Sequence, residues 1–219
     1  MSLWIKICGN TSLEDARLAV EAGADAVGFV FAQSPRRVTV VEVAAITAQL
    51  PETIEKIGVF VDAGLDEIEA TVRTCGLTGV QLHFEATLDF PARLRERLGP
   101  GLRILRVVHY GAGTSGDIAA HAVNADVDGV LVDSRTVTLV GGTGVAFDWA
   151  EARGTVFGDA RGLKLVAAGG LAPGNVAEAI AVLRPWGLDV VSGVESAPGR
   201  KDPAKMREFV HRARESASG

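Results

Sequence analysis

GADAVGFVF, at Gly23–Phe31, sets a pattern in which a turn containing Gly or Asp leads into a valine-rich run. The pattern returns as GLTGVQLH at 76–83, DVDGVLVD at 126–133 and GLDVVSGV at 187–194. Short apolar runs between turn signals are typical of strands buried on both faces of a parallel sheet. Glycine turns precede strands in many α/β proteins, but their recurrence along the whole chain favours a fold built from repeated strand–helix units.

Eight apolar runs alternate with helical patterns along the chain. We expect strands at 4–8, 26–31, 56–61, 79–82, 103–108, 129–132, 164–167 and 188–191. The spacing of apolar residues predicts helices at 12–21, with Ser12 as N-cap, and at 40–50, 66–74, 88–98, 117–122, 175–183 and 204–215, while 147–160 is less regular. This alternation predicts an α/β fold, a single closed (β/α)8 TIM barrel of parallel strands.

Length, charge and terminal sequence limit the class of protein. The chain has 219 residues and a TIM barrel usually has about 200–250, so we expect one domain over 1–219. The net charge of -5 and the lack of a Lys/Arg run argue against nucleic-acid binding. We see no signal peptide and no apolar run long enough to span a membrane, so we expect a cytoplasmic protein without a membrane partner. Both a monomer and a homodimer fit the sequence.

Cysteine and histidine spacing gives no sign of a metal site. Cys8 and Cys75 form neither a disulfide framework nor a ligand pair. The histidines form no HxxxH or HxH pair; they are His83, His109, His121 and His211. We therefore expect no bound metal.

Active sites of such barrels lie at the carboxyl ends of the strands. This rule selects a set of polar residues: Cys8, Gln81, His83, His109, Asp133, Ser134 and Ser192. By the same rule, Asp128, just before its strand, and Asp189, near the start of its strand, are interpreted as turn residues at the opposite end.

Two of the selected residues carry acid–base chemistry. A cysteine in an apolar run is usually a small buried hydrophobe. Lys6, however, lies on the same side of the strand as Cys8, and its ammonium group would favour a thiolate. Asp133 either caps a turn or, as we favour, is a partly buried carboxyl that transfers protons. His83 and His109 fit substrate binding and loop capping equally well.

Two anion-binding features accompany these residues. Backbone N–H groups of glycine turns in front of a helix bind phosphate, which barrels often hold after strands seven and eight. A glycine often serves only its turn, yet two such turns follow strands seven and eight, and a third glycine-rich stretch, 141–144, follows strand six. The candidate residues are Gly142, Gly170, Ser192 and Gly193. In the loop Ser34–Arg37, Arg36 could bind a carboxylate through two hydrogen bonds, although most basic loops are simply exposed.

Several longer motifs identify a family. They are KICGN at 6–10, SPR at 34–36, VQLH at 80–83, GGTG with FDW between 141 and 149, AGGLAPGNV at 168–176 and SGVESAPGRKD at 192–202. Through them the chain resembles phosphoribosylanthranilate isomerases of tryptophan biosynthesis over essentially its whole length. The resemblance implies that Cys8 is the general base, Asp133 the general acid and Arg36 a contact of the substrate's anthranilate carboxylate. It adds Gln81 and His83 as further substrate-binding residues.

The reaction implied is an Amadori rearrangement of N-(5-phosphoribosyl)anthranilate. An acid opens the ribose ring and a base removes the proton from C2, so Cys8 should have a lowered pKa. The resemblance implies a small phosphorylated substrate and neither cofactor nor metal.

Two residues depart from the family pattern, which often has Gly at Phe84 and Ser at Val191. We expect Phe84 to narrow the mouth of the site and Val191 to remove a hydroxyl. One alternative is a histidine-pathway or dual-substrate aminoaldose isomerase, but those enzymes use a carboxylate where this chain has Cys8. Another is a barrel that binds a phosphosugar without catalysis, and retention of Cys8 with Asp133 argues against it.

Overall fold

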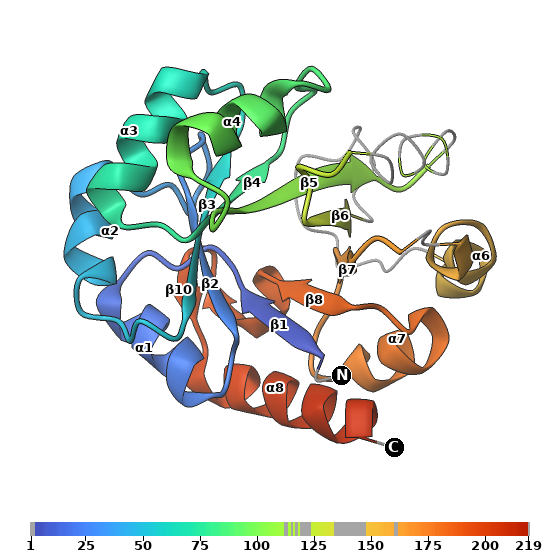
Figure 1. Ribbon diagram of the computed structural model, residues 1–219. Coiled ribbons are helices and arrows are strands. Elements are labelled where there is room, and N and C mark those ends of the chain that lie inside the picture. The colour runs from blue at the N-terminus through green and yellow to red at the C-terminus, as the bar shows by residue number, and fades with distance from the viewer. Residues whose placement is uncertain are drawn as a thin grey trace.

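The computed structural model describes residues 3–111, 114, 116, 118, 124–133, 148–159 and 162–218. Its centre is a closed barrel in which strands β1 to β8 pair in chain order and β8 pairs back with β1 (Figure 1). All neighbouring strands of the barrel are parallel. The TIM-barrel prediction is confirmed.

The elements follow the predicted order. The barrel strands are β1 (Trp4–Ile7), β2 (Ala26–Val30), β3 (Glu55–Phe60), β4 (Gly79–Leu82), β5 (Arg103–His109), β6 (Gly129–Asp133), β7 (Leu165–Ala168) and β8 (Gly187–Val190). The helices are α1 (Leu13–Glu21), α2 (Val40–Thr47), α3 (Leu65–Cys75), α4 (Phe90–Leu98), α6 (Trp149–Thr155), α7 (Val176–Leu183) and α8 (Pro203–Ser218). The helix predicted at 117–122 lies, apart from Ile118, outside the described residues.

Local capping explains where two of the helices begin. Ser12 accepts a hydrogen bond from the backbone N–H of Asp15, which confirms it as the N-cap of α1. At the start of α2, Thr39 and Glu42 form a reciprocal capping box. Such caps satisfy N–H groups that the first helical turn leaves without partners.

A small apolar cluster lies inside the barrel, and a larger one lies between the strands and the helices around them. The inner cluster consists of Trp4, Ala26, Ile57, Leu105, Leu131, Val166 and Ala168. At the amino ends of the strands Trp4 stacks on Trp186, with ring centroids 5.2 Å apart. The Arg103 guanidinium lies over both rings, and Lys164 lies over Trp186. This end of the barrel is therefore closed by packing, as expected of the end that carries no active site.

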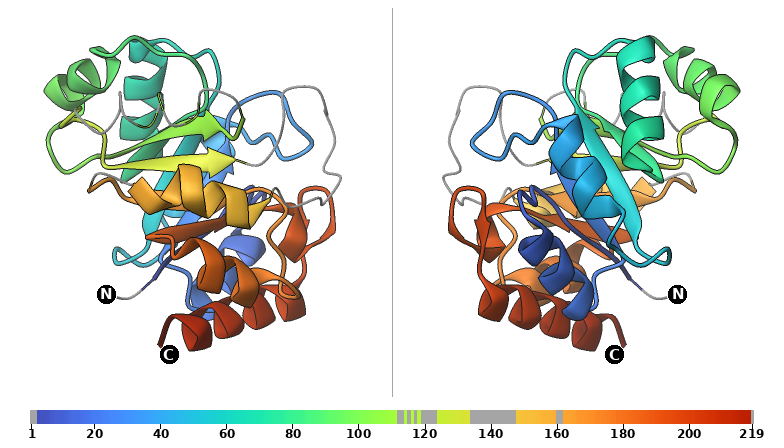
Figure 2. Two further views of the ribbon diagram at one scale, coloured as in Figure 1. Left: turned by 90° about the vertical axis from the view of Figure 1, so that its right-hand side faces the viewer. Right: turned by 90° about the vertical axis from the view of Figure 1, so that its left-hand side faces the viewer.

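The loops at the carboxyl ends of the strands form the opposite end. There the antiparallel hairpin of β9 (Glu195–Ala197) and β10 (Arg200–Lys201) follows β8. This hairpin is not among the elements predicted from the sequence. Figure 2 shows this hairpin and the N-terminus at opposite ends of the barrel.

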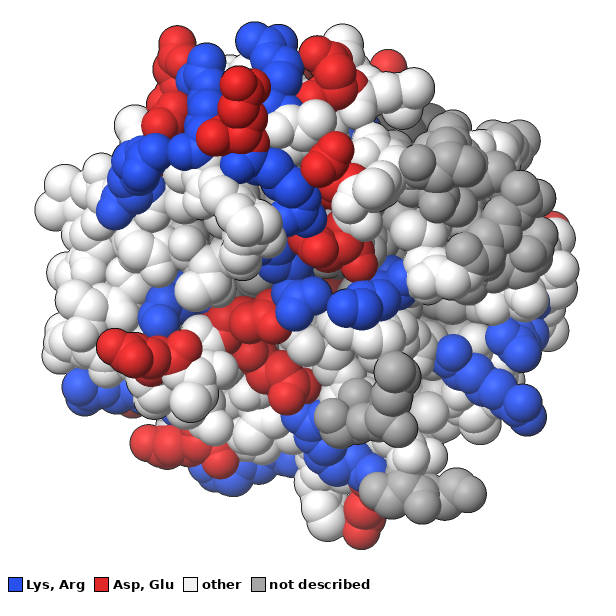
Figure 3. All heavy atoms as spheres, in the orientation of Figure 1, with Lys and Arg blue, Asp and Glu red and all other residues white. Residues whose placement is uncertain are grey.

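Two further observations concern the surface. On the face shown in Figure 3, acidic and basic side chains intermingle without forming a continuous basic area. None of the described helices has the length and apolar character needed to cross a membrane.

Candidate active site

Cys8 directly follows β1 and is buried. Its N–H donates to the carbonyl oxygen of Val190 at 2.9 Å, which extends the pairing of β1 with β8. Gly28, on β2, makes room for the thiol, because a Cβ at Gly28 would lie 2.6 Å from Cys8 Sγ and 2.9 Å from Lys6 Cε. Cys8 and Lys6 therefore share the inner side of the barrel wall, as strand alternation predicted.

The expectation that the Cys8 pKa is lowered is wrong in direction. Burial is the largest effect and raises the pKa of the Cys8 thiol above its ordinary value, and the negative charge of Asp189 acts in the same direction. The Lys6 ammonium opposes this rise through its charge and a hydrogen bond to the thiol, and Lys201 adds a weaker opposing charge. The sequence revealed the ammonium, but it did not reveal how deeply the thiol is buried.

Lys6 is fully buried and held by two acceptors. Its Nζ donates to Gln81 Oε1 and to Asp189 Oδ1, each at 2.8 Å. The interpretation of Asp189 as a turn residue is wrong, since it lies within β8 and pairs in register with Lys6. Asp128, by contrast, does lie just before its strand, where it accepts from the N–H of Ile104. Gln81, predicted to bind substrate, uses its side-chain oxygen to hold Lys6.

His83, His109 and Asp133 meet at the carboxyl ends of neighbouring strands. His109 pairs with Asp133 in the register of β5 and β6, and the His83 and His109 ring centroids are 5.2 Å apart. Asp133 is buried, His83 half-buried and His109 exposed. Possible ligand atoms of the three lie within 4.8 Å of one another, so they could hold a metal ion. Chain spacing could not show this, because the residues end three different strands.

The turns after β7 and β8 are packed against each other. Gly170 has a φ of 65°, in the left-handed region that favours glycine. A Cβ at Gly193 would lie 1.9 Å from the carbonyl oxygen of Leu171, so only glycine permits this approach of the two turns. Ser192 is exposed at the start of a short 3₁₀ turn, Ser192–Val194. The predicted phosphate-site residue Gly142 lies outside the described residues.

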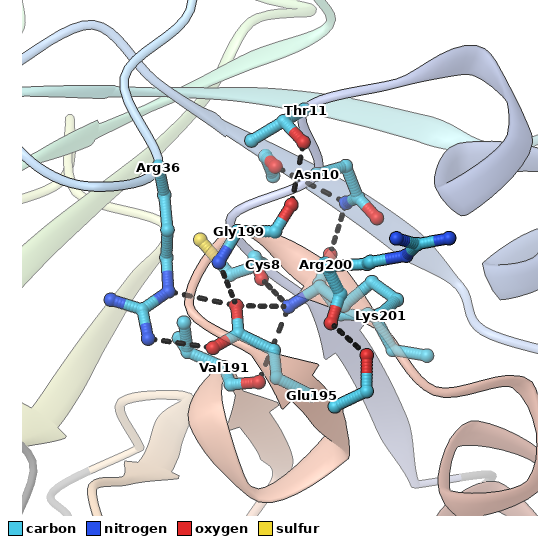
Figure 4. Close-up of polar contacts among 12 residues, drawn as sticks. Cys8, Asn10, Thr11, Arg36, Val191, Glu195, Gly199, Arg200 and Lys201 are labelled. Atoms are coloured by element: carbon cyan, nitrogen blue, oxygen red, sulfur yellow. Dashed lines mark hydrogen bonds and ion pairs between the residues drawn. The ribbon is translucent and has the colours of Figure 1, made fainter.

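Arg36 reaches the carboxyl end of β1 from the loop after β2. A Cβ at Gly9 would lie 2.7 Å from Arg36 Cδ, so the arginine stem passes directly over the residue that follows Cys8. The guanidinium forms an ion pair with Glu195, which raises the Arg36 pKa above its ordinary value mainly through hydrogen bonding (Figure 4). Glu195 lies within the SGVESAPGRKD motif, but its contact with Arg36 was not predicted, because the two residues are far apart in the chain.

A family model described as N-(5'phosphoribosyl)anthranilate (PRA) isomerase matches residues 5–212. The chain belongs to this family. The PRA isomerase of Trichlorobacter lovleyi is 43% identical over 213 residues, covering 97% of this chain and 98% of the relative. These matches confirm the family predicted from the motifs and, with it, an isomerase of tryptophan biosynthesis.

Solved PRA isomerases share the fold. The crystal structure of the enzyme from Thermotoga maritima has a TM-score of 0.82 and 35% identity, and covers 96% of this chain and 98% of its own. A PRA isomerase in complex with reduced 1-(o-carboxyphenylamino)-1-deoxyribulose 5-phosphate has a TM-score of 0.80 and 33% identity, with coverage of 96% and 98%.

The two departures from the PRA isomerase pattern have simple surroundings. Phe84 packs edge-on against Phe90 of α4, with centroids 5.5 Å apart, and joins the outer apolar cluster. The Phe84 ring therefore packs against α4, and this position does not support the expectation that Phe84 narrows the mouth of the active site. Val191 packs toward Gly9, and its carbonyl oxygen accepts a hydrogen bond from Lys201. The backbone at position 191 therefore takes part in the site although the side chain has no hydroxyl.

Proposed function

We propose that this chain converts N-(5-phosphoribosyl)anthranilate into 1-(2-carboxyphenylamino)-1-deoxyribulose 5-phosphate, with Cys8 as general base and Asp133 as general acid. The observation that carries the proposal is the placement of both groups. A thiol and a carboxyl stand buried at the carboxyl ends of β1 and β6, the end of the barrel where such enzymes carry their chemistry.

Each group has one proton to move. Asp133 gives a proton to the ribose ring oxygen as the bond from that oxygen to C1 breaks, and the nitrogen lone pair forms the C=N bond of a Schiff base. Cys8, as thiolate, then takes the proton from C2, and the released electron pair neutralises the iminium nitrogen to give an enolamine. Tautomerisation yields the ketone. The rearrangement needs no external oxidant or reductant, so it needs no redox cofactor.

The surroundings of Cys8 suit a base that is ionised only briefly. Because burial raises the Cys8 pKa, the thiolate is a minor fraction at neutral pH, and that fraction forms by loss of the thiol proton to solvent before the C2 proton is removed. Lys6, hydrogen-bonded to the thiol, and Lys201 supply positive charge that stabilises the thiolate once it forms. A base of higher pKa also removes a carbon-bound proton more readily, as Brønsted behaviour requires.

The remaining candidates hold the substrate by its two anionic ends. We assign the phosphate to the glycine turns around Gly170, Ser192 and Gly193, together with Gly142, and the anthranilate carboxylate to Arg36. We assign contact with the ribose to His83, which is half-buried beside Asp133, and a role through Lys6 to Gln81.

Several wider expectations stay predictions from the sequence. They are a single catalytic domain over 1–219, a cytoplasmic location, no nucleic-acid or membrane partner, and a monomeric or homodimeric state. The small phosphorylated substrate is the partner that the proposal requires.

A fluorescence assay of the purified chain with freshly made phosphoribosylanthranilate tests the proposal. Cys8→Ser and Asp133→Asn should each lower kcat by about 10²–10⁴-fold, the usual contribution of an acid or base, with unchanged circular dichroism. Near-normal turnover in either variant would overturn its assignment. Binding of the reduced product by wild type without turnover would identify a barrel that only binds phosphosugars. The histidine-pathway aminoaldose, assayed in parallel, detects a second substrate.

A further inference from the structure

The Arg36 guanidinium is bound along one of its edges. Nε donates to Glu195 Oε1 at 2.8 Å and Nη2 donates to Glu195 Oε2 at 2.6 Å, as Figure 4 shows. This is the two-point geometry that matches a planar guanidinium to a carboxylate. It fixes the plane of the guanidinium and the direction of its free end.

The other edge of the same group is open. A guanidinium has five N–H donors, and Glu195 takes one from Nε and one from Nη2. Among the described residues, none accepts a hydrogen bond from Nη1 of Arg36. The edge formed by Nη1 and Nη2 therefore has parallel N–H groups for a second carboxylate.

Glu195 is itself held in place from behind. Lys201, fully buried at its side chain, lies with Nζ 3.3 Å from Glu195 Oε1. The same Nζ donates to the carbonyl oxygens of Cys8 at 2.5 Å and Val191 at 3.2 Å. The β9–β10 hairpin thereby ties Glu195 to the backbone of the proposed base.

The charges of this cluster also favour an added anion. Arg36 and Lys201 are cationic and Glu195 is anionic, which leaves one positive charge after internal pairing. The side chains of Lys201 and Glu195 are 0% and 4% exposed, whereas that of Arg36 is 18% exposed, so the unpaired charge is reached from the Arg36 side.

We propose that Glu195, braced by Lys201, is a positioning residue that aims the open edge of Arg36 at the carboxylate of the substrate's aromatic ring. The proposal rests on the proposed function, because it takes that carboxylate as the ligand of Arg36. The stem of Arg36 over Gly9 places this grip beside Cys8. The stem of Arg36 over Gly9 and the hydrogen bond from Lys201 to the Cys8 carbonyl oxygen therefore link recognition of the carboxylate to the position of the base.

A competing interpretation makes the opposite prediction. If Glu195 instead occupies the place of the substrate carboxylate, the substrate must displace it, and removing its charge should improve binding. Under our proposal Glu195→Gln puts an amide N–H against the guanidinium and loosens its orientation. KM for phosphoribosylanthranilate should then rise about 10- to 100-fold, which is the cost of losing charge-assisted hydrogen bonds to one group. The change in kcat should be less than about threefold.

A substrate without the carboxylate separates positioning from a general structural effect. Phosphoribosylaniline keeps the ribose phosphate and the amine but has nothing for Arg36 to bind. Its KM should change less than about twofold in Glu195→Gln. Equal increases for both substrates would overturn the proposal, as would a lower KM for phosphoribosylanthranilate. Glu208→Gln, which removes an exposed partner of Arg212 in α8, is the matched control.

Three further measurements keep the test decisive. Adding Glu195→Gln to Arg36→Ala should raise KM no further than Arg36→Ala alone, because Glu195 acts through Arg36. If Glu195→Gln does not fold, Glu195→Asp keeps the charge beside Lys201 but shortens the reach, and should show the same split at smaller size. If wild type fails to turn over phosphoribosylanthranilate, the proposed function fails, and calorimetric binding of the reduced product still reports whether Glu195 and Arg36 act together.

Discussion

Lys6 Nζ lies 2.8 Å from Asp189 Oδ1 inside the barrel, and both side chains are almost completely shielded from water. The two residues are adjacent only because the barrel closes, which sets β8 beside β1 and pairs them in register. The Lys6 ammonium also forms a hydrogen bond with the Cys8 thiol. The ion pair therefore holds a cation next to the proposed base.

Asp189→Asn should strongly destabilise the fold. It leaves the fully buried Lys6 without a compensating charge, and loss of one partner of a buried pair costs about 3–5 kcal/mol. Urea unfolding measures the change in free energy. Asp66→Asn is the control, because Asp66 pairs with Arg97 on the surface, where the change should be small. A loss no larger than that of the control would show that Lys6 gives up its charge in the folded chain.

The fold could be predicted from sequence because strand periodicity, turn residues and length are local properties. The predicted strands lie within one residue of β1 to β8 at each end. Cys8 and Asp133 could be selected for the same reason, since both end a strand.

Contacts across the barrel could not be predicted in this way. Asp189 was misplaced because an Asp near a Gly before a strand also fits a turn, and its partner lies 183 residues away. The pairing of Arg36 with Glu195 spans 159 residues and depends on the β9–β10 hairpin, whose strands are too short to leave a periodic signal. Burial of the Cys8 thiol, which reverses the expected direction of its pKa, is likewise a property of the closed barrel.

The raised pKa of Cys8 predicts slow alkylation of the free enzyme at neutral pH. Only the thiolate reacts with iodoacetamide, and a pKa above the ordinary value of about 8.5 leaves little thiolate below pH 8. The rate should rise about tenfold per pH unit and continue to rise beyond pH 9. A Cys75→Ala background isolates Cys8, since Cys75 is the second thiol. A plateau below pH 8 would mean that Lys6 outweighs burial.

Gly193→Ala should weaken binding of the substrate phosphate. The added Cβ would meet the carbonyl oxygen of Leu171 at 1.9 Å, so the turns after β7 and β8 must separate. KM for the substrate, and the inhibition constant of inorganic phosphate, should each rise by about tenfold or more, as lost charge-assisted hydrogen bonds imply. Gly154→Ala is the control, because nothing lies within 4 Å of the Cβ it would add. Unchanged phosphate inhibition would place the phosphate elsewhere.

Added Zn²⁺ should inhibit turnover by occupying the ends of β4, β5 and β6. His83, His109 and Asp133 offer two imidazoles and a carboxylate whose ligand atoms lie within 4.8 Å, a donor set that Zn²⁺ accepts with a fourth position left open. Binding there would block the proposed role of Asp133 as general acid. Mg²⁺ should have no effect, since it prefers oxygen ligands.

His109→Gln tests whether Zn²⁺ inhibits by binding at these three residues, because it removes one of the ligands. His109 is the exposed member of the three, so its replacement should disturb the fold little. The variant should keep its turnover without metal. Inhibition by Zn²⁺ should weaken by about 10-fold or more, since even the loss of a residue that only supports a metal ligand costs that much affinity. EDTA should restore activity in both proteins. Equal inhibition of wild type and variant would instead point to the Cys8 thiolate. The two cases differ in the absorption of the Co²⁺ form, because a thiolate ligand adds an intense near-ultraviolet charge-transfer band and imidazole with carboxylate does not.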